Sequence, residues 1–171
     1  MEIVKGPNNS REELLAHMVA QYEVTLLRTC YMYLRDKGLA EDATQETFLK
    51  AYKGLNSFRG NSSERTWLIR IAINVCNDMR RSAWFRFIDK KVDVDRLEIP
   101  RADQNDVSIS LMMEIMRLPH KYMEVVLLYY YEDLKLNQIA EALGMSESMV
   151  SRRLRKAREM LKGMLEGVND E

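Results

Sequence analysis

The stretch GMSESMVSRRLRKAR, residues 144–158, carries five cationic side chains between positions 152 and 158 and no carboxylate after position 147. Directly before it, LNQIAEAL (136–143) has the short amphipathic pattern of a helix. A helix, a turn with glycine and a basic helix form the pattern of a helix-turn-helix. A solvated basic face is the alternative, but such a face seldom excludes acids so completely. The stretch therefore favours DNA binding.

Individual side chains support this geometry. Ala140 is small enough for two helices to approach closely, and Gly144 can adopt the left-handed conformation of the turn. Val150 and Leu154, one helical turn apart, are expected to pack the second helix onto the first, with Ser146 as its N-cap. The outer face, which a major groove could receive, is expected to show Ser148, Ser151, Arg152 and Arg155.

Bulk composition indicates a globular chain of one or two small domains. The 171 residues are 46% hydrophobic and 30% charged, with 26 basic and 26 acidic side chains. A net charge of zero excludes a uniformly basic coat. Because the cations of the basic segment are clustered, the charges are segregated, which favours one nucleic-acid partner and one protein partner.

No chemistry-bearing cluster is apparent. Cys30 and Cys76 lie far apart and are expected to be buried thiols, and no spacing indicates zinc. His17 and His120 are isolated, so no catalytic residues, no cofactor and no metal are expected. Neither a signal peptide nor a run of about 20 apolar residues is present, which predicts a cytoplasmic protein without membrane insertion.

The first part of the chain predicts three helices. A capping box at Ser10 is expected to start the first helix, and Gly38 to stop it. The second helix, from about 40 to 53, carries a polar stripe with one aliphatic member, which without further information favours a solvated face over an interface. The members of this stripe are Asp42, Gln45, Glu46 and Leu49.

The loop 58–63 leads into a third helix, expected from 64 to about 82. One face of this helix is a continuous polar stripe of Arg70, Asn74, Asn77 and Arg81. Arginine and asparagine are suited to contact phosphates and base edges. Phe58 and Trp67 could stack on an unpaired base or could pack in the core, and both readings stay open.

Residues 85–107 lose helical periodicity and contain Pro100, so they are expected to be a flexible linker. Beyond them, a helix from 109 to 118, a second after Pro119 and the helix-turn-helix complete the chain. The predicted fold is all-α, with two small helical domains (10–84 and 108–165) joined by the linker. The polar tail after Lys162 is expected to fray.

In three segments the sequence resembles an extracytoplasmic-function (ECF) sigma factor of bacterial RNA polymerase. The segments are EDATQETFLKAY (41–52), FRGNSSERTWLIRIAINVCNDMRR (58–81) and LPHKYMEVVLLYYYEDLKLNQIAEALGMSESMVSRRLRKAREML (118–161). The resemblance implies a protein that is no enzyme. It would bind core polymerase, recognise and melt a promoter, act as a monomer on the polymerase and be held inactive by an anti-sigma factor.

The resemblance also implies roles for residues. The stripe Asp42, Gln45, Glu46 and Leu49 would dock on the clamp helices of the largest polymerase subunit. The minus-ten element would be melted and read by Phe58, Arg59, Asn61, Ser62, Trp67, Arg70, Asn74, Asn77 and Arg81. The minus-thirty-five duplex would be read by Ser146, Ser148, Ser151, Arg152, Arg153 and Arg155.

Two positions depart from the family pattern. Ala43 stands where a larger aliphatic side chain is usual, so clamp docking or local packing can differ. Ser148 and Met149 replace a small residue followed by threonine, so the promoter sequence cannot be transferred.

A helix-turn-helix repressor or activator with a sensing domain is the main alternative, and it would bind duplex DNA unaided, usually as a dimer. A nucleic-acid enzyme is disfavoured because its catalytic groups are missing.

Overall fold

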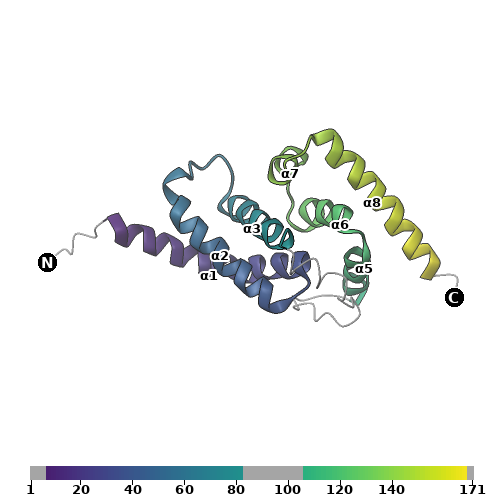
Figure 1. Cartoon of the computed structure of the whole chain (residues 1–171), viewed down its shortest axis with the longest axis horizontal. Helices are drawn as coiled ribbons and strands as arrows, with labels where there is room; N and C mark the ends of the chain where they lie inside the picture. The colour runs from purple at the N-terminus through teal and green to yellow at the C-terminus, as the bar shows by residue number, and fades with distance from the viewer. Residues whose placement is uncertain (1–6, 83–105, 169–171) are drawn as a thin grey trace. The chain divides into compact units, whose positions relative to one another are not determined.

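The computed structural model describes residues 7–82 and 106–168, and the chain divides into two units, Met1–Arg86 and Phe87–Glu171 (Figure 1). Throughout the described ranges every regular element is a helix, so the predicted all-α class is confirmed. The predicted linker 85–107 lies almost entirely outside the described residues. Each unit has a hydrophobic core of its own.

The N-terminal unit is a bundle of three long helices in which α1 packs against both α2 and α3. Its core is dominated by large side chains from α1 and α3 that are fully buried, among them Met18, Leu26, Tyr33 and Leu68. In chain order the elements are α1 (Pro7–Leu34), α2 (Lys37–Gly54), the 3₁₀ turn η1 (Leu55–Ser57) and α3 (Glu64–Arg80).

The buried side of α2 consists mostly of small residues. Ala40, Ala43 and Ala51 have no exposed surface, and the hydroxyls of Thr44 and Thr47 donate hydrogen bonds to backbone carbonyls one turn earlier, at 2.7 and 2.6 Å. Side chains of this size let two helices approach closely while no buried hydroxyl is left unsatisfied. The Ala43 departure therefore lies in the helix packing, behind the polar stripe.

The ends of α1 differ from the prediction. Ser10 lies inside α1, which begins at Pro7, so the predicted cap is wrong. The helix ends at Leu34 because Arg35 takes a left-handed conformation (φ 57°), and Asp36 then caps α2 by accepting a 2.8 Å hydrogen bond from the N–H of Leu39. Gly38, the predicted stop, is part of α2.

Helix α3 buries a wider face than its sequence pattern indicated. Helical spacing predicts a buried side made of Leu68, Ile71, Ala72, Val75 and Met79. Ile69, Ile73 and Cys76 are buried in addition, whereas Ile71 and Met79 are only half-buried. The wider face arises because α3 is packed by α1 and α2 from two directions.

Cys30 of α1 and Cys76 of α3 meet in this core, and both are buried free thiols, as predicted. A hydrogen bond with Cys30 and burial raise the pKa of the Cys76 thiol well above its ordinary value. A thiol held neutral in this way is a weak nucleophile and a good core group.

The C-terminal unit packs the three shorter helices α5, α6 and α7 against the long helix α8. Met123, Leu127, Val150 and Leu154 are buried where α6 and its continuation meet α8. In chain order the elements are α5 (Asp106–Arg117), α6 (His120–Val126), η3 (Leu127–Tyr131), α7 (Leu136–Leu143) and α8 (Glu147–Val168).

The predicted turn between α7 and α8 is confirmed in detail. Gly144 has φ 65°, and the N–H groups of Met145 and Gly144 donate to the carbonyls of Ala140 (3.0 Å) and Glu141 (3.4 Å). This pair of bonds is the Schellman motif, which satisfies carbonyls at the end of a helix. The hydroxyl of Ser146 then accepts from the N–H of Met149 at 3.2 Å, so Ser146 caps α8 as expected.

Three expectations for this unit differ from the structure. Spacing predicts that Tyr130 packs against the helix-turn-helix with Met123, Val126 and Leu127, but Tyr130 is 54% exposed and meets α8 at the surface, through Arg158. The tail after Lys162 continues α8 to Val168, with an ion pair between Lys162 and Glu166 at 3.8 Å. Also, α5 begins at Asp106, three residues before the predicted start.

Candidate functional site

The polar stripe of α2 lies on the outside of the N-terminal bundle. Asp42, Gln45 and Leu49 are exposed and Glu46 is half-buried. Leu49 is notable because 56% of an aliphatic side chain faces solvent between acidic and amide groups. We call these four residues the α2 stripe.

A second surface combines the loop after η1 with the outer face of α3. Gly60 has φ 71° with open space around it, so the loop turns where a side chain would be strained. Ser63 ends the loop and caps α3 by accepting from the N–H of Thr66 at 3.1 Å, a role that the sequence reading missed although Ser63 directly precedes the helix.

Phe58 and Trp67 contact each other across this loop. Their ring centroids are 4.7 Å apart, with the planes inclined by 34°, and both side chains are half-buried. They therefore pack on each other and still expose part of their surface. Gly54 lies below Trp67, where a Cβ would be 3.5 Å from the indole ring.

The predicted stripe along α3 is one face of the helix. Asn74 and Arg81 are exposed, while Arg70 and Asn77 are half-buried. One carboxylate borders this face, since Asp78 accepts a hydrogen bond from Arg81 at 3.3 Å. From the loop, Arg59 and Asn61 are exposed and Ser62 is half-buried. The structure thus places the predicted minus-ten residues along one loop and one helix face.

The third surface lies on α8, where the predicted residues do not form a single group. Because successive helical residues are about 100° apart, Ser148, Ser151, Arg152 and Arg155 fall within about 100° of one another. They lie opposite the buried Val150 side of the helix. Ser146 uses its hydroxyl for the cap.

Arg153 points elsewhere. Its Nη1 lies 3.0 Å from Oε1 of Glu124, a carboxylate of α6 that is only 7% exposed. The other carboxylate oxygen lies 3.4 Å from Nε2 of His120. The pair thus joins α8 to α6.

Beside Arg153, α6 and α8 enclose a hollow of about 370 Å³ with a basic lining. The sequence reading missed Lys121 and Lys156 here. Lys156 belongs to the basic segment, but Lys121 comes from another helix and has no local signal. The lining consists of Lys121, Tyr122, Met149, Arg152, Arg153 and Lys156.

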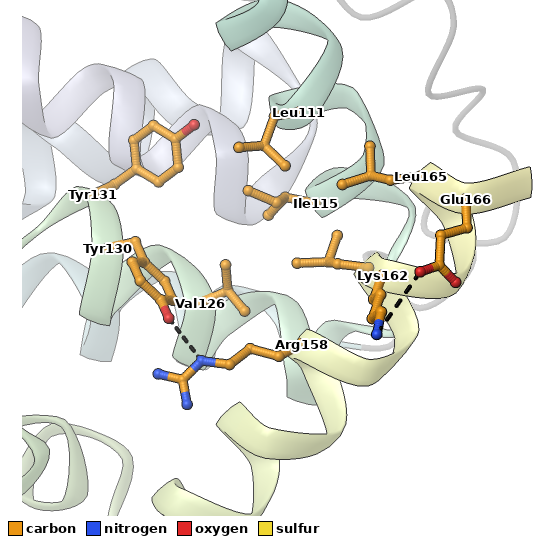
Figure 2. A pocket seen from close by; sticks show the side chains of 10 residues that line it. Leu111, Ile115, Val126, Tyr130, Tyr131, Arg158, Lys162, Leu165 and Glu166 are labelled. Atoms are coloured by element: carbon orange, nitrogen blue, oxygen red, sulfur yellow. Dashed lines mark hydrogen bonds and ion pairs between the residues drawn. The ribbon is translucent and has the colours of Figure 1, made fainter. Parts of the chain in front are cut away.

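An apolar pocket of about 560 Å³ lies on another side of α8 (Figure 2). Figure 2 shows Leu111 and Ile115 of α5 facing Leu165 of α8 across it. At its edge, Nε of Arg158 donates to the hydroxyl of Tyr130 at 2.7 Å, so this cation of the basic segment also points away from the outer face.

Within residues 7–82 and 106–168, no three His, Cys, Asp or Glu side chains are grouped so as to hold a metal ion. None of the helices in those ranges combines the length and apolar character that a bilayer crossing requires.

Family comparisons match both units. Residues 18–86 match the model of Sigma-70 region 2, and residues 108–161 match that of Sigma-70, region 4. The chain belongs to the ECF sigma factors. One curated relative is the RNA polymerase sigma factor YlaC of Bacillus subtilis, which is 33% identical over 88% of this chain and 92% of its own length. Another is the ECF sigma factor SigW of the same organism, which is 29% identical over 95% of this chain and 94% of its own length.

Solved structures share the fold of this sigma factor. RpoE of Bartonella quintana, in complex with the anti-sigma factor NepR, aligns with a TM-score of 0.71 over 88% of this chain and 96% of that one, at 20% identity. CnrH, in complex with the cytosolic domain of CnrY, aligns with a TM-score of 0.65 over 91% and 90%, at 22% identity. At these identities the likeness shows the fold. The function is that of a sigma factor in transcription initiation, as the resemblance predicted.

Proposed function

We propose that this sigma factor binds core RNA polymerase through the α2 stripe and reads a promoter with two separate domains. The N-terminal domain, 10–84, recognises and melts the minus-ten element, and the C-terminal domain, 108–165, recognises the minus-thirty-five element. Residues 85–107 link them. The polymerase supplies the catalysis, so the sigma factor itself carries out no chemistry.

The α2 stripe is proposed as the docking surface for the clamp helices of the largest subunit. A hot spot in a binding interface is a side chain that becomes fully desolvated while neighbouring contacts exclude water, although leucine fills this role less often than aromatic residues or arginine. Leu49 supplies the apolar group, and Asp42, Gln45 and Glu46 place acidic and amide groups on its N-terminal side. Ala43 is fully buried beneath the stripe, so the departure from the family pattern affects packing before it affects docking.

The loop 58–63 and the outer face of α3 are proposed to hold the melted nontemplate strand. Removing a base from the duplex stack costs a few kcal/mol. Hydrogen bonds from the polar loop, stacking on the partly exposed Phe58 and Trp67, and phosphate contacts from Arg70 and Arg81 would offset that cost.

The outer face of α8 is proposed to enter the major groove of the minus-thirty-five element. The observation that carries the proposal is the exposure of Arg152 and Arg155 on the side of the second helix-turn-helix element that faces away from the core. Lys121 and Lys156, at the basic hollow, add candidate phosphate contacts beside that face.

We further propose that the protein acts in the cytoplasm as a monomer on the polymerase and that an anti-sigma factor covers its binding surfaces. The support is membership of the ECF family, in which such a partner is common. RpoE of Bartonella quintana has been solved with a factor of this kind.

The test is run-off transcription with core polymerase on genomic fragments, with and without the sigma factor. Discrete transcripts that require both components are expected, and the isolated chain should bind the same fragments weakly. The alternative, a repressor or activator, predicts that the isolated chain binds these fragments tightly and that core polymerase does not need it to make discrete transcripts. If the purified chain ignored core polymerase and bound intact duplex DNA tightly as a dimer, the proposed function would be wrong.

A further inference from the structure

The ion pair between Glu124 and Arg153 joins the recognition helix to the scaffold of its domain. Glu124 lies in the middle of α6 with 9% of its side chain exposed, and Arg153 lies near the start of α8 with 26% exposed. Their contact atoms are 3.0 Å apart, and the two residues are separated by 29 positions in sequence. A buried carboxylate needs such a partner because an isolated charge is costly to desolvate.

The direction of Arg153 sets it apart from its neighbours. A helix advances about 100° per residue, so Arg152 and Arg153 cannot both face the same groove squarely. Arg152 is exposed, whereas the guanidinium of Arg153 turns toward α6. Val150 and Leu154 hold α8 by burying apolar surface, and this attraction has no preferred direction. A directional charged hydrogen bond at the margin of that contact constrains rotation more strongly.

We propose that Arg153 is a positioning residue, which sets the rotation of α8 in the major groove through its bond to the buried carboxylate of Glu124, and that it does not contact DNA. This inference rests on the proposed function, since it concerns how the minus-thirty-five surface is oriented. It replaces the direct role that the resemblance implied for Arg153.

Substituting Glu124 distinguishes a DNA-contacting from a positioning role of Arg153, because the two roles predict different changes in DNA affinity. In the Glu124→Gln variant, the amide keeps the shape of the side chain but loses its charge. If Arg153 contacted DNA, the variant would release a cation and remove a nearby negative charge, so DNA binding would tighten or stay unchanged. If Arg153 positions α8, the variant loosens the helix and binding to the selected sequence weakens.

The experiment uses holoenzyme assembled from core polymerase and the full chain, with duplexes that the wild-type holoenzyme selects from a random pool at the minus-thirty-five position. Glu124→Gln is expected to weaken binding to the selected duplex on the order of tenfold, while binding to scrambled duplex is retained. The ratio of specific to non-specific affinity therefore falls. A loss of stability alone would lower both affinities in proportion to the folded fraction and would leave this ratio unchanged.

Two control variants complete the design. Glu159→Gln makes the same chemical change at an exposed carboxylate of α8, paired only loosely with Lys156 at 3.5 Å, and should leave the specificity ratio unchanged. Lys156→Met, at a proposed phosphate contact, should reduce the magnitude of the slope of log K against log salt by about one, whereas Arg153→Met should lower the specificity ratio and keep the slope.

The outcomes are distinguishable. If the wild-type holoenzyme selects no sequence, the proposed function fails and this inference fails with it. If the wild type selects a sequence and Glu124→Gln binds it equally well or more tightly, only the inference is overturned. Should Glu124→Gln not fold, Glu124→Asp keeps the charge and shortens the reach, and an unchanged specificity ratio in that variant would also overturn it.

Discussion

The turn between α7 and α8 depends on a left-handed residue, and the chain contains a matched position at which the same substitution should act in the opposite direction. Gly144 has φ 65°, and a Cβ added there would meet nothing within 4 Å. The cost of Gly144→Ala is therefore purely conformational. A residue with a Cβ pays about 1–2 kcal/mol in the left-handed region. The smaller entropy of the unfolded chain returns part of that, about 0.5–1 kcal/mol. We expect a net destabilisation of about 1 kcal/mol.

Gly163 is the control because it lies inside α8, also with open space where a Cβ would be, but in a conformation that alanine prefers. Gly163→Ala should stabilise the helix by about 0.5–1 kcal/mol. Two chemically identical substitutions in one domain should thus differ by about 1.5–2 kcal/mol, or about 10- to 30-fold in the opening equilibrium. At Gly144, asparagine should cost less than alanine and valine should cost more.

Hydrogen exchange read by peptide is the suitable assay, since the two units can open separately. Peptides from α7 and α8 should lose protection in Gly144→Ala and gain it in Gly163→Ala, while peptides from α1, α2 and α3 serve as the internal reference. The reasoning would be refuted by equal effects of the same sign at both positions, or by a tolerance of valine at Gly144 equal to that of asparagine.

Three further substitutions test the sites and the core. Leu49→Ala should weaken binding to core polymerase by about 1–2 kcal/mol in a titration. The control is Val24→Ala in α1, where an apolar side chain is 66% exposed, and it should leave binding unchanged. Arg152→Ala should cost about 1–3 kcal/mol at one base pair of the minus-thirty-five element, measured as a loss of discrimination there, and equal loss on all sequences would contradict a base contact. For Cys76, the raised pKa of the folded state means that the unfolded state releases the proton first, so the unfolding free energy should fall as the pH rises above about 9. Denaturant titrations at several pH values should show a flatter fall in Cys76→Ala, and an unchanged slope would show that folding does not raise the pKa of Cys76.

Local chemistry explains what could be predicted from the sequence. Gly144 and Ser146 each act through backbone groups within five positions, so their roles in the turn and the cap follow from residue type and spacing alone. The periodicity of α2 likewise shows which residues share the stripe, because a helix face is a property of spacing. These features are found in the folded protein as predicted because they do not depend on tertiary contacts.

Other features depend on contacts that no local pattern contains. Helix α1 ends at Leu34, directly before Arg35 in the left-handed conformation, whereas sequence preference predicts a stop at Gly38, three residues after Arg35. The cap that Asp36 supplies to α2 begins the next helix so early that Gly38 is already inside it. The capping box at Ser10 predicts a helix start that the structure does not have, because α1 begins at Pro7 and continues through Ser10.

The basic segment illustrates how folding divides a charge cluster that the sequence presents as one. Its five cations would give a salt slope of about −4.5 if each neutralised a phosphate. In the folded domain, Arg153 is held by Glu124 and Arg158 by Tyr130. Arg152, Arg155, Lys156 and Arg158 are the exposed cations of the segment, and the three that are not held by a tyrosine hydroxyl would contribute about −2.7. The density of positive charge therefore points to the helix that we propose binds DNA, but it overstates the number of contacts, because a helix that presents one face to DNA must use another to hold its own position.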